Sequence, residues 1–478
     1  MDSTNGPWRF HELTKHTVAS VRGSAHRLDW DNQPRPYKRY VRAAQIALPN
    51  PALESDQPAL AAIAGACSID ADHVPDAALI SAVLQLSAGI TKWLTFPGGR
   101  MPFRAAACTG ALYHIDLYLV CRELAGIPAG VYHHDVESGN LTVLRAGDYR
   151  AALAEAAACQ PAPAFLVLAS TYWRNAWKYE SRAWRHCFWD SGTILANLLA
   201  VANAHHLPAQ VLSAFVDDAV NRLLGLDPDR EAALAVVPLG SGGSVAPQPP
   251  PVTPLDLKVE PYSAFEVDYP LIREAQRASA LGSVDAVRAW REQALPVPLG
   301  EASASLPLPM GQGTVEQSIL RRGSARRFVP AAIGLDELEA VLAPAEAPIA
   351  ADFPALTRPY LILNGVDGLG PGAYRGLRDV IRIGSMRLEA GHLALDQRLA
   401  ADAAVNVYFM AWPRLGERGY RAAQLDGSIR GGRVYLAAYT LGLAATGLTF
   451  YDDEVSELFE TSEQVTFLVA LGHRGPRQ

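Results

Sequence analysis

The amino-acid sequence predicts an α+β fold that occurs twice in one chain. The main observation is a set of short motifs that recurs in the same order about 235 residues later. The first copy has Ala183-Trp184-Arg185, Asp190-Ser191-Gly192, Phe215-Val216-Asp217-Asp218 and Val237-Pro238-Leu239-Gly240. The second copy has Gly419-Tyr420-Arg421, Asp426-Gly427-Ser428, Phe450-Tyr451-Asp452-Asp453 and Val469-Ala470-Leu471-Gly472. An earlier pair of blocks precedes each copy, namely Leu117–Val120 with Ala129–Tyr132, and Pro359–Ile362 with Pro371–Tyr374. This order indicates a duplicated domain whose halves have diverged.

Both halves contain predicted strands and predicted buried helices. The strands are expected at Leu117–Val120, Phe165–Leu168 and Val405–Met410. The segments Ile194–Ala204 and Ile429–Leu441 are apolar on nearly every side, which is typical of buried helices. Strands and helices do not alternate regularly, and no glycine-rich turn opens a helix after a strand. The fold class is therefore α+β, without a nicotinamide-type Rossmann domain.

Composition shifts divide the chain into four segments. The N-terminal segment is rich in Arg, Pro and aromatic residues and is expected to wrap a domain surface as an arm. A Gly- and Pro-rich tether separates the two domains. Within the second domain, a charged helix near Ser283–Leu295 and a Pro-rich stretch, Pro296–Met310, come first. The predicted segments are 1–55 for the arm, 56–240 for the first domain, 241–256 for the tether and 257–478 for the second domain.

The overall composition fits two buried cores and argues against nonspecific nucleic-acid binding as a main role. Apolar residues make up 49% and charged residues 19% of the 478 residues, and the net charge of −7 disfavours contact with phosphate backbones. The five cysteines form no close pair and the N-terminus has no apolar signal core, so we expect a cytoplasmic protein. The longest apolar stretch, Val434–Phe450, is interpreted as a buried helix and strand, with no membrane span.

The most basic segment is Arg321–Phe328. Arginine guanidinium groups bind phosphate oxygens in pairs, and a serine hydroxyl between them adds a hydrogen bond. The alternative interpretation of such a run is a solvated basic face. Arg474 and Arg477 follow the final Leu-Gly motif, and they favour a phosphate site built from both segments.

The pair Lys178-Tyr179, preceded by Trp177, is the candidate proton acceptor. A lysine between large aromatic side chains is desolvated, which lowers its pKa and makes it a usable base near neutral pH. The alternative is a surface lysine whose stem covers apolar neighbours while its ammonium group stays in water.

The segment Arg104–Tyr113 contains small residues and leads into a predicted strand. Such a loop allows a flat ring to lie against the backbone, and the alternative is a plain packing turn. Cys108 in this loop could act as a nucleophile, but no histidine-and-carboxylate pattern accompanies it. The doublets His133-His134 and His205-His206 lack zinc-ligand spacing, so no metal site is predicted.

Together these motifs resemble the FMN-dependent nitroreductase superfamily. Arg322-x-Ser324-x-Arg326-x-Phe328 is similar to its flavin-phosphate motif, Leu443–Asp453 to its segment beside the flavin ring, and Leu471–Arg474 to its C-terminal end. The first half resembles the azoline dehydrogenase branch, which oxidises thiazolines and oxazolines in modified peptides. That branch has an Arg-x-x-Pro-Ser-x-Gly-Ala-Leu-Tyr loop, similar to Arg104–Tyr113, and a Lys-Tyr pair similar to Lys178-Tyr179.

Each half departs from the family pattern where the other half keeps it. The loop has Ala107-Cys108 in place of Pro-Ser, the first half has no Arg-x-Ser-x-Arg motif, and the second has Arg414-Leu415 in place of Lys-Tyr. Members of this family are typically dimers that hold FMN at the interface, so the resemblance implies an intrachain pseudo-dimer with one composite FMN site. The cofactor-binding residues that it implies are Arg104, Cys108, Thr109 and Gly110 from the first half, and Arg322, Ser324, Arg326, Gly447, Leu448 and Arg474 from the second.

The resemblance implies an FMN-dependent oxidoreductase that dehydrogenates thiazoline or oxazoline rings to thiazoles or oxazoles in natural-product biosynthesis. Lys178 or Tyr179 would take a proton while N5 of FMN takes hydride. The expected partners are an azoline-containing peptide or carrier-bound substrate and a cyclising enzyme, and a homodimer of the chain is compatible with the sequence. Two other functions stay open, an NAD(P)H-dependent nitro or quinone reductase and a non-catalytic peptide-docking scaffold.

Overall fold

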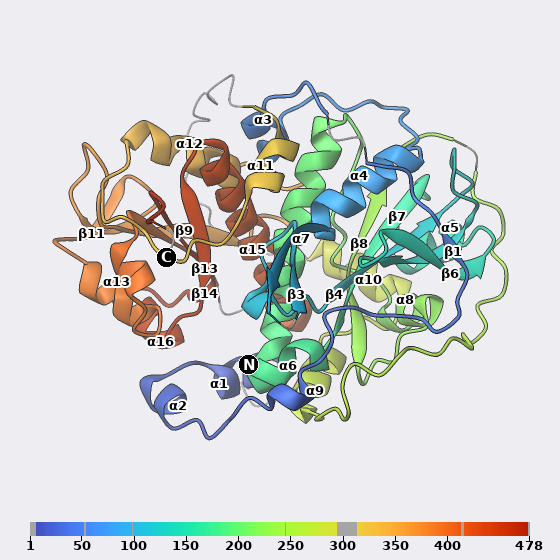
Figure 1. The fold of residues 1–478 in the computed structure, drawn as a ribbon, viewed down its shortest axis with the longest axis horizontal. Helices are drawn as coiled ribbons and strands as arrows, with labels where there is room; N and C mark the ends of the chain where they lie inside the picture. The colour runs from blue at the N-terminus through green and yellow to red at the C-terminus, as the bar shows by residue number, and fades with distance from the viewer. Residues whose placement is uncertain are drawn as a thin grey trace.

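The computed structural model describes residues 6–51, 54–97, 99–243, 245–293, 313–412 and 415–476. Each half contains a six-stranded antiparallel sheet, and two long helices pack against each other between the halves (Figure 1). The predicted Pro-rich stretch Pro296–Met310 and the residues Arg414 and Arg477 lie outside the described residues.

The first sheet has the strand order β1-β6-β5-β4-β7-β8. Its strands are β1 (Gln45–Ile46), β4 (Ile115–Cys121), β5 (Gly130–Asp135), β6 (Asn140–Ala146), β7 (Ala164–Thr171) and β8 (Glu231–Leu239). Side chains alternate between the two faces of a strand, and those of β4 enter two different hydrophobic clusters. Leu117 and Leu119 join one cluster, and Tyr118 and Val120 join the other. Both faces of the sheet centre are therefore covered.

The second sheet repeats this arrangement in the order β11-β10-β9-β12-β14-β13. Its strands are β9 (Thr357–Leu363), β10 (Gly372–Arg375), β11 (Asp379–Ile383), β12 (Val405–Ala411), β13 (Ala444–Leu448) and β14 (Gln464–Gly472). The series β6-β5-β4-β7-β8 corresponds to β11-β10-β9-β12-β14, and the repeated sequence blocks fall on corresponding strands. The predicted α+β class and the predicted duplication are confirmed.

Helices surround the sheets, and two of them form the centre of the molecule. The outer helices are α1 (Pro7–Thr14), α2 (Val18–Arg22), α3 (Ala59–Ala64), α4 (Ala77–Ala88), α5 (Arg150–Ala156), α6 (Trp173–Tyr179), α8 (Asp217–Leu224), α9 (Pro270–Ala278), α10 (Val284–Glu292), α11 (Val315–Arg321), α12 (Leu335–Glu346), α13 (Arg387–Leu393), α14 (Arg398–Asp402) and α16 (Asp452–Leu458). The central pair is α7 (Ala183–Ala204) and α15 (Gly416–Thr440). Glycine permits their close approach, because a Cβ at Gly192 would overlap Ser428 Oγ and one at Gly432 would lie 2.5 Å from Ala196 Cβ.

Reciprocal buried ion pairs join the two halves. Asp452 of the second half accepts from Arg185 (2.5 Å) and Arg182 (3.0 Å) of the first half. In the mirror arrangement, Asp217 of the first half pairs with Arg421 (2.8 Å) and Arg418 (2.7 Å) of the second half. All six side chains are buried. The Arg and Asp-Asp motifs that revealed the repeat are therefore the residues that cross between its copies.

The same exchange continues at the residues that precede these arginines. Trp184 and Tyr420, which occupy corresponding motif positions, stack on each other with their ring planes 4° apart and their centroids separated by 5.7 Å. Contacts between corresponding residues occur on the axis of a twofold arrangement. The two halves are thus related as the subunits of a dimer are, within one chain.

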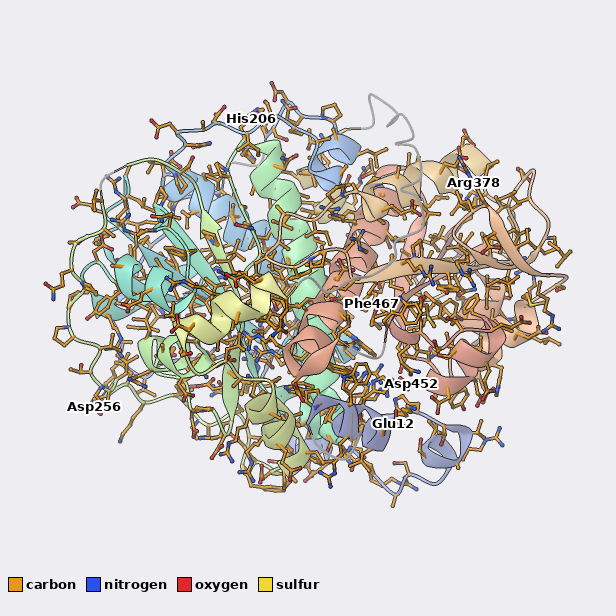
Figure 2. The ribbon with its side chains drawn as sticks, turned by 180° about the vertical axis from the view of Figure 1, so that it is seen from behind. Glu12, His206, Asp256, Arg378, Asp452 and Phe467 are labelled. Carbon is orange, nitrogen blue, oxygen red and sulfur yellow. The ribbon has the colours of Figure 1, made fainter. Side chains whose placement is uncertain are left out.

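The N-terminal arm predicted at residues 1–55 wraps the molecule and also contributes regular structure. β1 adds to the edge of the first sheet, and α1 lies over the interface between the halves. His16 N donates to Asp452 Oδ2 (2.8 Å), and Figure 2 shows Glu12 of this arm beside Asp452. The arm therefore covers one of the two buried ion-pair clusters.

The segment that follows the predicted tether contacts both halves of the molecule. Val41 N of the arm donates to Lys258 O (2.8 Å), and Arg291 of α10 donates to the carbonyl oxygens of Ala157 and Ala158 in the first half. Arg291 also donates to Asp352 of the second half (2.9 Å). The predicted start of the second domain at residue 257 stays a prediction.

One hairpin stands outside both sheets. It consists of β2 (Ile90–Phe96) and β3 (Gly99–Arg104), which pair only with each other. Within the described part of the chain, no helix has the length and apolar character needed to cross a bilayer.

We expect Asp452→Asn to lower the free energy of unfolding by about 3–5 kcal/mol, because it leaves Arg182 and Arg185 buried without a counter-charge. Asp453→Asn is the matched control. Asp453 is half-exposed and pairs with Lys15, so its loss should cost less than about 1 kcal/mol. Urea denaturation of both variants measures the difference.

The same aspartate should affect acid stability. The two arginines hold the pKa of Asp452 well below its ordinary value despite its burial. A depressed folded-state pKa stabilises the protein above the unfolded pKa of about 4 and loses that effect as pH falls. The gap in stability between wild type and Asp452→Asn should therefore narrow below about pH 4. A constant gap would contradict the ion-pair explanation.

Candidate active site

The arginine-rich segment Arg321–Phe328 is fastened to the second sheet. Ala325 N donates to Ala445 O on β13 (2.9 Å), and Phe328 forms a β-bridge with Arg474. These backbone contacts bring the segment, the C-terminal Arg474 and the end of β13 together at one edge of the second domain.

The guanidinium groups of this region lack acidic partners within the described chain. Arg322 donates to Arg104 O (2.8 Å) and Ala105 O (2.7 Å), and Arg474 donates to the hydroxyl of Tyr439 (2.7 Å). Arg326 is exposed. Positive charge that no carboxylate balances, on forked donors, stabilises a bound anion. Because Arg322 contacts the loop Arg104–Tyr113, the structure brings two of the sequence-predicted groups together across the domain boundary.

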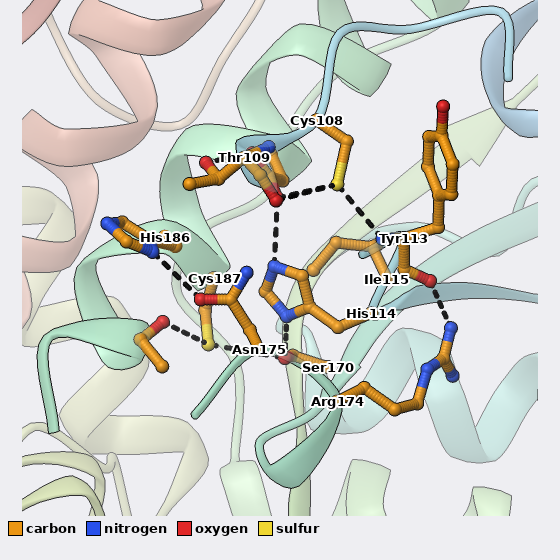
Figure 3. A network of polar contacts seen from close by, with 12 residues as sticks. Cys108, Thr109, Tyr113, His114, Ile115, Ser170, Arg174, Asn175, His186 and Cys187 are labelled. Carbon is orange, nitrogen blue, oxygen red and sulfur yellow. Dashed lines mark hydrogen bonds and ion pairs between the residues drawn. The ribbon is translucent and has the colours of Figure 1, made fainter. Parts of the chain in front are cut away.

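A buried carboxylate, Asp190, anchors that loop, and Figure 3 shows its neighbours Cys108, Thr109 and His114. Asp190 on α7 accepts hydrogen bonds from the backbone and hydroxyl of Thr109 (2.9 and 2.7 Å). Its other oxygen contacts Cys108 Sγ (3.0 Å) and His114 Nε2 (2.9 Å). His114 Nδ1 in turn lies 2.8 Å from Ser170 Oγ on β7. The loop backbone is therefore fixed from beneath by the central helix and the first sheet.

This arrangement keeps Cys108 protonated. Burial and the neighbouring Asp190 carboxylate raise the pKa of its thiol well above the usual value. The thiolate is the nucleophilic form of cysteine, so this residue is poorly suited to nucleophilic catalysis. Its side chain and that of Thr109 point to Asp190, which leaves the loop backbone as the part that faces the second domain.

The side chain of Arg104 also points inward. Its guanidinium group donates to Pro36 O (2.5 Å) and Ile115 O (3.3 Å), and the side chain is buried. Its backbone carbonyl is the group that meets Arg322 of the second domain. Arg104 thus braces the loop from within the first domain.

Lys178 and Tyr179 form the C-terminal end of α6. Lys178 is partly buried, and both burial and the positive charge of Arg326 lower its pKa. Tyr179 lies against the loop, because a Cβ at Gly110, whose φ is +65°, would stand 2.8 Å from the Tyr179 hydroxyl.

The end of β13 supplies the last part of the site. Gly447 is exposed, and its N–H donates to the hydroxyl of Tyr435, which lies 3.5 Å from Ser324 Oγ. Leu448 is partly buried, and the buried hydroxyl of Thr449 has no hydrogen-bond partner among the described residues. Buried hydroxyl groups normally have a partner, so Thr449 fits a position beside a polar ligand.

The corresponding position on the other side of the molecule is closed. Strand pairing makes Val211 the counterpart of Gly447. Its N–H donates to Ala350 O (2.8 Å) and its carbonyl accepts from Asp352 N (2.9 Å), so the backbone of the second domain covers it. Arg291 of α10 lies against the same place, where it donates to Asp352 (2.9 Å) and to Ala214 O (2.8 Å).

The first domain also lacks the positive charge that the second domain has. The segment Ala66–Asp72 follows α3 as Arg321–Phe328 follows α11. It contains Asp70 and Asp72 and no arginine. Carboxylates repel a phosphate, so this segment is unsuited to the task of its counterpart. Among the described residues, arginines without acidic partners therefore occur at one of the two corresponding positions, in Arg321–Phe328, and not at the other.

Sequence reasoning missed three residues that organise this site. Asp190 belongs to a repeated motif, and the recurrence of an aspartate at that position was the available sign that it has a structural role. His114 and Tyr435 gave no signal, because one lies at the start of a strand and the other in an apolar helix. Their roles depend on contacts between segments that are far apart in the chain. No group of three or more metal-ligating side chains is found among the residues that the structure describes.

Comparisons with known proteins agree with this architecture. Residues 68–241 match the family described as Nitroreductase family. A protein of Methanocaldococcus jannaschii that is named as a nitroreductase is 26% identical over 142 residues, which cover 29% of this chain and 70% of that protein. A crystal structure at 1.80 Å of a protein of Anabaena variabilis, also named as a nitroreductase, matches with a TM-score of 0.75 and 24% identity. That match covers 98% of this chain and 99% of the other.

The chain has the nitroreductase fold in two tandem copies. The family match lies in the first domain, and the structural match extends over both. The two domains meet where Arg322 of the second domain contacts the loop Arg104–Tyr113 of the first.

We expect Asp190→Asn to speed the alkylation of Cys108 by iodoacetamide, because removing the negative neighbour lowers the pKa of the thiol. Each unit of pKa changes the thiolate fraction about tenfold. Cys159 is the internal control, since burial raises its pKa to about 11 without any contribution from Asp190. Peptide mass spectrometry at pH 8 follows both residues. Equal rates for Cys108 in the two proteins would contradict the proposed contact.

Proposed function

We propose that this protein is an FMN-dependent dehydrogenase that oxidises thiazoline or oxazoline rings, carried on a peptide or a carrier-bound precursor, to thiazoles or oxazoles. The observation that carries the proposal is the position of Lys178. It is a partly buried lysine on the first domain, and the next residue, Tyr179, lies against the loop at Gly110. Arg322 of the second domain contacts the same loop through the carbonyl oxygens of Arg104 and Ala105. A base beside a phosphate-binding position suits a reaction that removes a proton next to a bound nucleotide-type cofactor.

The residues present suit FMN. Arg322, Ser324, Arg326 and Arg474 would hold its phosphate with charged and neutral donors. The backbone of Thr109 and Gly110 on one side, and of Gly447 and Leu448 on the other, would flank its ring. The exposed glycines allow close approach, and the unpartnered hydroxyl of Thr449 is available for a polar ring edge.

Bound FMN would supply the hydride acceptor, with dioxygen as the final acceptor of the two electrons. The chain supplies the base. Neutral Lys178 would take the proton from one azoline ring carbon as the hydride leaves the adjacent carbon, and the product gains aromatic stabilisation. Burial and Arg326 both increase the neutral fraction of Lys178 near neutral pH, which is the form that accepts a proton.

Tyr179 is a poorer candidate for the base. Burial, together with the nearby Asp190 and Cys108, raises the pKa of its phenol. A phenol with a raised pKa stays protonated at neutral pH and is a poor proton acceptor. We therefore assign Tyr179 to positioning, between Gly110 and the ring of His186, whose centroid lies 4.6 Å away.

We expect Arg326→Ala to weaken FMN binding by about tenfold or more, because it removes a charged donor to the phosphate. Arg378→Ala is the control, since Arg378 is exposed in the turn between β10 and β11 at the periphery (Figure 2). Fluorescence titration of the apoprotein with FMN gives both the affinity and the stoichiometry. One FMN per chain is expected, and two per chain would contradict the closed second position.

We expect Lys178→Ala to retain FMN and to lower azoline turnover by roughly 100-fold or more, as loss of a general base does. Lys258→Ala is the matched control, because Lys258 is an exposed lysine on the tether side of the first domain. The turnover rate of the wild type should rise with pH and then level off, because the neutral amine of Lys178 is the active form. The pH at the midpoint of this rise should lie below 10.5, the ordinary pKa of lysine. Unchanged turnover in Lys178→Ala would remove this residue from the mechanism.

Rapid flavin reduction by NADPH without azoline oxidation would favour a nitro or quinone reductase instead.

A further inference from the structure

The β2–β3 hairpin is present in only one of the two copies. Residues 89–114 separate α4 from β4 in the first domain, whereas residues 347–356 separate the corresponding α12 and β9. The hairpin accounts for this difference. It belongs to the domain that carries Lys178, which is the half that would meet the substrate.

The base of the hairpin lies at the composite site. β3 ends at Arg104, whose carbonyl accepts a hydrogen bond from Arg322 of the second domain (2.8 Å). Ala105 N donates to Gly89 O (2.9 Å) and closes the base. Figure 1 shows β3 at the face where the two halves of the molecule meet. Anything bound along the hairpin would thus extend from the site itself.

One edge of this hairpin is free to pair with another strand. Trp93 stands opposite Pro102, and Thr95 stands opposite Arg100. Proline has no N–H, so we place the Trp93–Pro102 pair at a position where backbone groups point away from the partner strand. By the alternation of antiparallel ladders, Thr95 also points its N–H and C=O outward. β2 therefore presents an unpaired edge within the described chain, while Pro102 interrupts the edge of β3.

The hairpin has an exposed apolar face, and the hairpin as a whole carries a net positive charge. Leu94, Phe96 and Met101 are 47%, 49% and 37% exposed. The hairpin also carries Lys92 and Arg100 and contains no acidic residue. An exposed apolar stripe next to a free strand edge is typical of peptide recognition by strand addition, and the basic residues favour a peptide with acidic side chains.

We propose that β2 binds the substrate peptide as an added strand. The occupant is an extended segment with apolar side chains and at least one acidic residue, which flanks the azoline ring. Its backbone pairs with Trp93 and Thr95, and its apolar side chains extend the face formed by Leu94, Phe96 and Met101. The inference rests on the proposed function, because it identifies the class of substrate as a peptide.

The binding test uses the FMN-loaded protein and a fluorescein-labelled peptide with Asp-Val-Leu on each side of a thiazole, the product ring. Thr95→Pro removes the outward N–H, and we expect it to weaken binding by about tenfold, measured by fluorescence anisotropy. Thr95→Ser is the matched control and should bind as wild type does. A second series keeps the protein unchanged and methylates the peptide amides one at a time. Strand addition predicts that alternate methylated positions lose affinity and the positions between them do not.

Turnover of a free thiazoline ring without a peptide separates this inference from the proposed function. If the free ring is oxidised while Thr95→Pro and every methylated peptide bind normally, the docking edge is wrong and the proposed function stands. If peptide binding shows the alternating pattern but no azoline is oxidised, the docking edge stands and the proposed function fails. A dimer in sedimentation experiments that Thr95→Pro dissociates would show that a second copy of the chain occupies the edge, which overturns the proposal.

Discussion

Two buried aspartates, each paired with two arginines from the opposite half, fix how the two halves of the molecule pack together. Asp452 with Arg182 and Arg185, and Asp217 with Arg418 and Arg421, are exchanged about the packed helices α7 and α15. Burying a charge is costly unless it is paired, so any sliding of one half on the other would leave charges without partners. The two pairs thus fix the relative position of the domains, and the composite site depends on that position.

The symmetry that these ion pairs impose is broken at the two places where a cofactor could lie. On one side, Gly447 is exposed and Arg322 contacts the loop held by Asp190. On the other, Val211 is paired with the second domain and Arg291 lies against the same place. A duplicated chain can specialise its copies in this way, because each site needs only one phosphate segment and one facing loop. The first domain has kept the lysine and the loop, and the second has kept the arginines.

The repeated motifs allowed much of this architecture to be predicted. The α+β class, the duplication and the central helices followed from periodicity and repetition. The loop and the arginine segment were recognised as a possible pair, and Arg322 does contact the loop carbonyls. The start of the second domain at residue 257 stays a prediction, because α10 contacts both halves through Arg291. The inward direction of the Arg104, Cys108 and Thr109 side chains also escaped prediction, since it depends on Asp190 in a distant helix.

The sequence alone determined which residue types were available and in what order, since hydrophobic periodicity and repeated motifs are local properties of the chain. It marked the Arg and Asp-Asp motifs as repeated but could not show that they pair across the copies. Only the tertiary structure decided that exchange, the closing of the second position and the contact of Arg322 with the loop carbonyls. These are contacts between segments that are distant in sequence, and burial and charge pairing in the packed molecule select them.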